Sequence, residues 1–89
     1  MKAVISVIGK DTVGIIAKVS AECARCGVNI LDISQTVLQD YFTMIMMVDA
    51  TACELPIGQL IQVMKEEGEK QDLDIHVQRE DIFNAMHRI

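Results

Sequence analysis

Aromatic side chains, basic clusters and long apolar runs are all scarce in this sequence of 89 residues. There is no tryptophan, and the aromatic residues are limited to Tyr41, Phe42 and Phe83. The net charge is −5 with no cluster of lysine or arginine, whereas a nucleic-acid binder needs a basic face to neutralise phosphates. No apolar run approaches the roughly 20 residues that cross a bilayer. We therefore expect neither a nucleic-acid partner nor a membrane span.

Cysteine and targeting signals are sparse as well. The three cysteines are an odd number and show no spaced framework of the kind that disulfide-rich proteins carry. The N-terminus lacks the basic start and the small-residue cleavage site of a secretion signal. Together these absences predict reduced thiols and a cytoplasmic location.

Apolar residues, by contrast, make up 51% of the chain, and six of them are methionines. With so few aromatic rings, the core must be aliphatic, with methionine filling irregular gaps. The length suits one compact domain and is too short for two. A domain this small buries a limited share of its surface, so the high apolar content favours a homodimer or a higher homo-oligomer.

The first half of the chain predicts a strand, a helix and a second strand. Residues 2–8 are apolar at both parities, which is typical of a central strand. A helical pattern follows Asp11 and ends at Gly27, with Ile16 on its apolar face and Glu22 on its polar face. Residues 28–38 form a strand whose apolar phase changes near Leu31, which indicates either a bulge or a second cover on that strand.

The second half of the chain predicts a strand, a helix and a strand again. After a turn at residues 39–41, residues 42–48 form another strand that is apolar on both faces. A helix follows, beginning near Pro56 and ending at Gly68. Residues 73–78 alternate between apolar and polar positions, as a half-solvated edge strand does.

These elements predict an α+β, ferredoxin-like βαββαβ sandwich: a four-stranded antiparallel sheet in the order 4-1-3-2 with two helices on one face. We assign residues 1–79 to this domain and residues 80–89 to a short C-terminal helix. The other face of the sheet would then expose apolar side chains of the central strands, to be covered by the tail, a second protomer or both.

Two positions are candidates for a binding site. Asp11 can cap the following helix, and that structural role would by itself explain the residue. Alternatively, free N–H groups at the helix start attract a carboxylate, and Gly14 would let a small ligand approach the backbone. Asn29 is unexpected in a strand and could either bond a loop carbonyl or present its amide to a ligand.

At these positions the sequence resembles the ACT domain family. The stretch from Gly9 to Ile30 is similar to the family pattern G-x-D-x-x-G-x-x-A-x-V…G-x-N-I, and the resemblance covers about residues 1–79. The continuation from Asp32 and the ending near Phe83 are similar to the small stand-alone ACT proteins of bacteria and archaea, including relatives of the glycine-cleavage-system repressor type.

The resemblance implies a regulatory module that binds an amino acid or a similar small metabolite. It implies that protomers pair side by side into one eight-stranded sheet, with the ligand between the first loop of one chain and the second strand of the other. Since the chain carries no enzyme or DNA-binding domain, its output must pass to a separate protein. The ligand contacts carried over by position are Asp11, Thr12, Val13, Gly14, Asn29 and Ile30.

Other chemistry has weaker support. Cys23 and Cys26 form a C-x-x-C pair, but at the end of a helix, whereas redox pairs of this type sit at a helix start; nor do the remaining Cys and His residues supply a second pair of zinc ligands. His76 and His87 have no nearby carboxylate or nucleophile in sequence that suggests a catalytic unit. We predict no enzyme activity, metal or cofactor. The alternative function is a protein-interaction module that uses the open sheet face and the tail.

Overall fold

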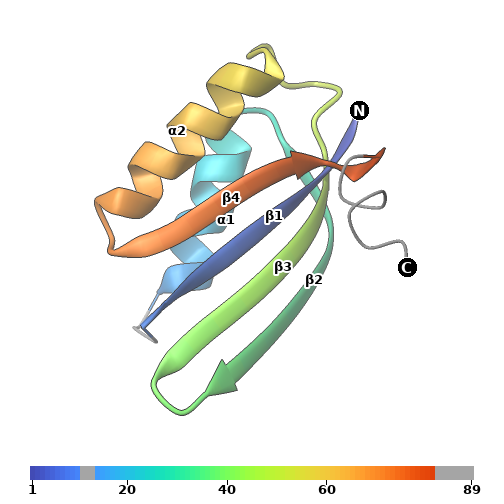
Figure 1. Cartoon of the computed structure of the whole chain (residues 1–89). Coiled ribbons are helices and arrows are strands. Elements are labelled where there is room, and N and C mark those ends of the chain that lie inside the picture. Colours follow the sequence, from blue (N-terminus) through green and yellow to red (C-terminus); the bar gives the residue numbers. More distant parts are fainter. Residues whose placement is uncertain (11–13, 82–89) are drawn as a thin grey trace.

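Four strands and two helices follow one another in the predicted order β-α-β-β-α-β. The structure, a computed structural model, describes residues 1–10 and 14–81 (Figure 1). Most of the tail helix predicted for residues 80–89 lies outside the described residues. In chain order the elements are β1 (Lys2–Lys10), α1 (Ile15–Arg25), β2 (Asn29–Leu38), β3 (Tyr41–Asp49), α2 (Ile57–Glu69) and β4 (Leu73–Arg79).

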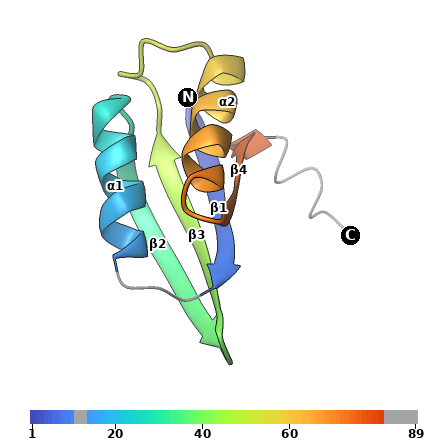
Figure 2. The same cartoon turned by 90° about the vertical axis from the view of Figure 1, so that its left-hand side faces the viewer.

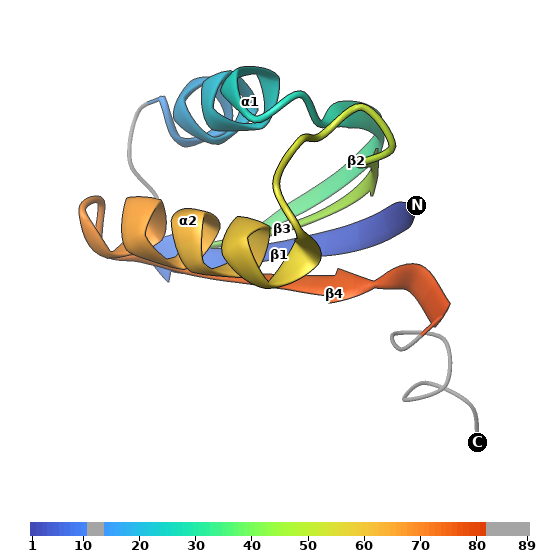
Figure 3. The same ribbon diagram turned by 90° about the horizontal axis from the view of Figure 1, so that it is seen from above.

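The strands form one antiparallel sheet in the order β2-β3-β1-β4, which is the predicted order counted from the other edge. Both helices cover the same face of this sheet, and the opposite face carries no helix of the described chain (Figures 1 and 3). The predicted ferredoxin-like fold is therefore confirmed, with β1 and β3 as the central strands.

The core lies between the sheet and the two helices. β1 and β3 present alternate residues to it, as a period of two requires, and β4 adds Leu73, Ile75 and Val77. Phe42 is the only aromatic residue of this described core, so the packing is aliphatic, as predicted. The largest fully buried side chains are Ile5, Met44, Met46, Leu60, Met64, Val4, Val7, Val19, Val48 and Cys23.

β2 contains a bulge, which is one of the two alternatives that its sequence indicates. Its pairing with β3 shifts register between Ile30 and Asp32, so Leu31 is the extra residue. Beyond the bulge, Ile33 faces Met46 and Val37 faces Phe42, which places these β2 side chains on the helix-covered face. The change of apolar phase in the sequence therefore marks a local irregularity of the backbone.

α1 departs from its predicted faces at two positions. Glu22, predicted on the polar side, is only 8% exposed, and Ile16, predicted on the buried side, is 37% exposed. The helix ends as expected, with Gly27 at φ 77°. The N–H of Val28 donates to the carbonyl of Cys23 at 2.9 Å, so the last turn is closed by a left-handed glycine cap.

Gly68 does not end α2, as the sequence predicts, but lies inside it. Its position is explained by β4, because an added Cβ would lie 2.7 Å from the carbonyl oxygen of Leu73 and 2.9 Å from Ile75 Cγ1. Glycine is therefore needed for close approach of helix and strand. Gly58, at the start of the same helix, has nothing within 4 Å of its Cβ position.

This contrast gives a matched pair of substitutions. Gly68→Ala should lower the free energy of unfolding by about 1–3 kcal/mol because the methyl group overpacks against backbone. Gly58→Ala should raise it by about 0.5–1 kcal/mol because alanine favours the helix. Urea unfolding of both variants tests this, and equal effects would show that α2 does not press against β4.

Cys23 is a buried core thiol. Burial raises its pKa from 9.0 to about 11, with smaller contributions from Cys26 and Glu22. The unfolded chain therefore loses this proton at a lower pH than the folded chain does. The stabilisation is complete below about pH 9 and is lost as the pH rises toward 11.

We accordingly expect the free energy of unfolding to decline between pH 9 and 11 by more in the unmodified chain than in a Cys23→Ala variant. The variant should be less stable at neutral pH, because it leaves a cavity, but its pH curve should be flatter. Denaturant unfolding across this pH range measures both curves. Parallel curves would mean that the thiol does not titrate as its burial requires.

Candidate functional site

Four of the six predicted site residues precede α1. Asp11, Thr12 and Val13 lie outside the described residues, so their roles stay predictions. Gly14 is exposed and adopts φ 87° immediately before the helix. An added Cβ there would meet no atom within 4 Å, so glycine is favoured by the left-handed backbone and not by crowding.

The other two predicted residues begin β2. Asn29 is exposed and pairs across the sheet with Asp49. Ile30 is partly buried, packs against the core and pairs with Val48. The amide of Asn29 is therefore accessible to a ligand, whereas Ile30 mainly anchors the start of the strand.

Within one chain these two groups lie at opposite ends of the sheet. The end of β1 lies beside the β2–β3 hairpin, where Lys10 pairs with Tyr41. Asn29 lies at the other end, opposite Asp49. Since β2 has ten residues, its ends are about 30 Å apart. Gly14 and Asn29 of the same chain therefore do not share a site.

A cleft of about 400 Å³ lies beside Gly14, within the usual size range of small-molecule sites. The first turn of α1 lies over the second half of β2 here (Figure 2). The cleft's side chains are apolar except for the amide of Gln35, and backbone groups supply the rest of its polar surface. Sequence reasoning missed Gln35 and Val37 as site residues, although both share the helix-facing parity of β2. The lining residues are Gly14, Ile15, Ile16, Ala17, Gln35, Val37 and Phe42.

The outer edge of β2 is long and poorly protected. The strand NILDISQTVL carries one charged residue, Asp32, and contains no proline or lysine, the residues that usually prevent edge pairing. Next to this edge, Ile16, Ile33 and Val37 are 37%, 39% and 52% exposed on the helix-covered face. We call these three residues the β2 edge surface. The other edge strand, β4, is shorter and ends in Arg79.

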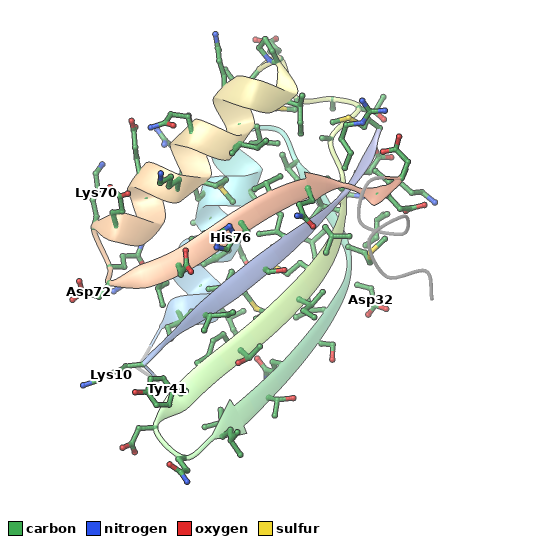
Figure 4. All side chains as sticks on the ribbon, viewed as in Figure 1. Lys10, Asp32, Tyr41, Lys70, Asp72 and His76 are labelled. Atoms are coloured by element: carbon green, nitrogen blue, oxygen red, sulfur yellow. The ribbon has the colours of Figure 1, made fainter. Side chains whose placement is uncertain are left out.

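The open face of the sheet is mixed in character. Ile8, Tyr41 and Ile45 are exposed there, as predicted for the central strands, but polar side chains lie among them (Figure 4). On β4, His76 Nε2 lies 3.0 Å from Asp74 Oδ1, so the prediction that His76 has no carboxylate neighbour was wrong. Both side chains are largely exposed, which is typical of a surface pair of small energetic weight.

The thiols at the end of α1 are poor nucleophiles. Burial, followed by the nearby Glu22 carboxylate, raises the pKa of Cys26, and the pKa of Cys23 is raised further. A redox C-x-x-C pair requires the opposite shift. In the part of the chain that the structure describes, no three His, Cys, Asp or Glu side chains are grouped so that they could hold a metal ion.

The two helices are short, at 11 and 13 residues. Across residues 1–10 and 14–81, no helix is long and apolar enough to cross a membrane.

Comparison with known proteins gives one consistent family. The family model for the ACT domain matches residues 2–78. A UPF0237 protein of Clostridium perfringens is 54% identical over 89 residues, which cover the whole of both chains. A UPF0237 protein of Methanopyrus kandleri is 44% identical over 88 residues, covering 99% of this chain and 98% of the other.

Solved structures agree with this. An ACT domain protein from Streptococcus pneumoniae superimposes with a TM-score of 0.84 at 42% identity, covering 98% of both chains. A structure described as a glycine cleavage system transcriptional repressor has a TM-score of 0.72 at 24% identity, covering 86% of this chain and 44% of the other, which shows a shared fold. The protein belongs to the ACT domain family, as its loop and strand motifs indicate.

Proposed function

We propose that this chain is a homodimeric sensor that binds an amino acid at its subunit interface and passes the signal to a separate protein. The ACT domain is a regulatory fold that binds small molecules, and this supports the general role. The observation that carries the specific proposal is the separation of Gly14 from Asn29 along β2, next to an unprotected strand edge. A single chain holds both halves of the site but cannot join them.

A two-fold axis through the β2 edge would join them. When two copies pair antiparallel along β2, the partner's Asn29 comes to the hairpin end of the first chain, beside the start of α1. The same pairing satisfies the open N–H and C=O groups of the edge and covers the β2 edge surface. It extends the sheet to eight strands and forms two equivalent sites.

The ligand groups then have natural partners. The N–H groups of Val13 and Gly14, which precede α1 in the sequence, suit the carboxylate, as helix N-termini favour anions. The amide oxygen of the partner's Asn29, or the carboxylate of Asp11, suits the ammonium group. The apolar cleft beside Gly14 accepts the ligand side chain, with Gln35 as its polar contact.

The remaining parts of the proposal concern domain limits, location and catalysis. We propose one ACT domain over residues 1–79 followed by a tail over residues 80–89. The three free cysteines fit a reducing cytoplasm. We propose no catalysis, because the two C-x-x-C thiols have raised pKa values and the His76–Asp74 pair lies exposed on the open face.

The competing proposal is a protein-interaction module that uses the open face and the tail. Ile8, Tyr41 and Ile45 give this face some apolar area, but Ser6, Thr43 and the His76–Asp74 pair interrupt it. The β2 edge offers both backbone groups and apolar side chains, so it is the better interface.

The first test is the mass in solution. The unmodified chain should sediment at twice its monomer mass of 9.9 kDa. Ile33→Lys should shift the mass toward the monomer, because two lysines would face each other near the two-fold axis. Ile61→Lys on α2 is a matched control, since Ile61 is also 39% exposed. A monomeric unmodified chain, or dissociation by both variants alike, would contradict the proposed dimer.

The second test is thermal shift against the standard amino acids. A ligand present at 100 times its Kd should add about 2.7 kcal/mol of stability if it binds only the native dimer. Asn29→Ala should weaken binding about tenfold by removing one bond to a charged group. Ile33→Lys should abolish the shift, because the two halves no longer meet, while Ile61→Lys should keep it. The absence of a shift with every amino acid would refute the sensor proposal.

A further inference from the structure

A second cleft, of about 440 Å³, lies at the opposite end of α1 from Gly14. The loop between β3 and α2 passes beside the C-terminal end of α1 there and forms the other wall (Figure 2). Since α1 has 11 residues, the two clefts are separated by about 16 Å along the helix. The lining residues of the second cleft are Ala24, Arg25, Cys26, Gly27, Ala52, Glu54, Leu55 and Val63.

A buried charge lies next to this cleft. Glu22 is 8% exposed and is the only buried charged residue of the described chain. It lies in the C-terminal half of α1, where the helix dipole disfavours a carboxylate, and burial adds a desolvation penalty. Packing alone does not explain an acid at this position, since an apolar residue would fill the space without these penalties.

Glu22 instead fixes the position of Arg25. Arg25 donates a hydrogen bond from Nη2 to Glu22 Oε1, and the thiol of Cys26 lies 3.9 Å from the same oxygen. The Arg25 side chain stays 68% exposed while it lines the cleft. A guanidinium has five N–H donors, so the pair with Glu22 leaves donors that can face a ligand.

The opposite wall supplies the complementary charge. Glu54 lines the cleft from the β3–α2 loop, and Leu55 and Val63 add apolar surface. An anion alone would bind poorly, because the carboxylates of Glu22 and Glu54 outnumber the Arg25 cation. A cation alone would leave the guanidinium donors that Glu22 does not use without a partner. A small zwitterion with an apolar side chain satisfies both walls.

We propose that this cleft is a second ligand site, which binds a small apolar α-amino acid with its carboxylate on Arg25 and its ammonium group on Glu54. The side chain lies on Leu55 and Val63, and Glu22 acts as a positioning residue for Arg25. Each chain of the proposed dimer then has this site in addition to its share of the interface site. This second site requires no partner chain, so ligand binding there can be tested independently of the proposed dimer.

Amide NMR on the full chain tests the proposal with valine as the probe. Valine should cause saturable shifts at Gly27 and Ala52, whereas isovalerate, which lacks the ammonium group, and isobutylamine, which lacks the carboxylate, should bind about tenfold more weakly or worse. Shifts at Gly14–Ala17 would report the interface site separately. The absence of valine shifts at Gly27 and Ala52, or equal binding of all three probes, would overturn the proposal.

Substitutions identify the charged contacts. Glu54→Gln should weaken valine binding at this cleft about tenfold while leaving the fold intact, because Glu54 is exposed on a loop. Glu69→Gln, the same exchange at an exposed position at the other end of α2, should have no effect. Arg25→Lys keeps the charge beside Glu22 but loses the planar guanidinium, which can bind a carboxylate through two N–H groups. It should therefore weaken valine binding with little change in the free energy of unfolding. Unchanged binding in both Glu54→Gln and Arg25→Lys would refute the site.

Discussion

The antiparallel pairing of β1 with both β3 and β4 is the constraint on which the rest of the molecule depends. It places the first strand of the chain in the middle of the sheet, so each later element must pack beside or above it. The helices connecting these strands both lie on one face, and their apolar residues close a single core over Ile5 and Val7. The same arrangement leaves β2 and β4 as edges. Everything proposed about function follows from which residues those edges and helix ends present.

The two edge strands differ in how well they are protected against pairing with another strand. β4 is short, alternates cleanly and exposes the charged or polar residues Asp74 and His76, which discourage pairing with another strand. β2 is longer and nearly uncharged, with apolar residues beside it on the helix-covered face. An isolated monomer would gain solubility from protecting both edges. The asymmetry is therefore understandable if β2 is retained as an interface, where backbone pairing and burial of Ile33 and Val37 both contribute.

Most of the fold could be predicted because it is encoded in short-range patterns. Apolar residues at both parities identified the central strands, and the change of phase at Leu31 located the bulge. The errors arose where tertiary contacts override the pattern. Gly68 is a typical helix terminator in sequence, yet it serves contact with β4. Glu22 looks like a surface residue on a helical wheel, and nothing in the local sequence shows that α1 turns it inward.

The site was less predictable than the fold for the same reason. Gly14 and Asn29 were identified from their local sequence context and from the family resemblance, whereas Gln35 was missed because it becomes a cleft residue only when α1 lies over β2. The loop and strand motifs are local in sequence, but the cleft walls come from elements that are distant along the chain. Sequence patterns therefore identify candidate contacts more readily than the surface that selects a ligand.

The position of the proposed interface site gives a physical route from ligand to signal. A ligand that contacts the loop of one chain and Asn29 of its partner binds only the paired state, so it must strengthen pairing by the same factor by which pairing strengthens its binding. A second site within each chain would lack this direct linkage, because its two walls belong to α1 and the β3–α2 loop of one protomer. It could influence the first through α1, whose start borders one cleft and whose end borders the other. A shift of this helix along the sheet would alter both clefts together, which makes α1 the element through which the two sites would be coupled.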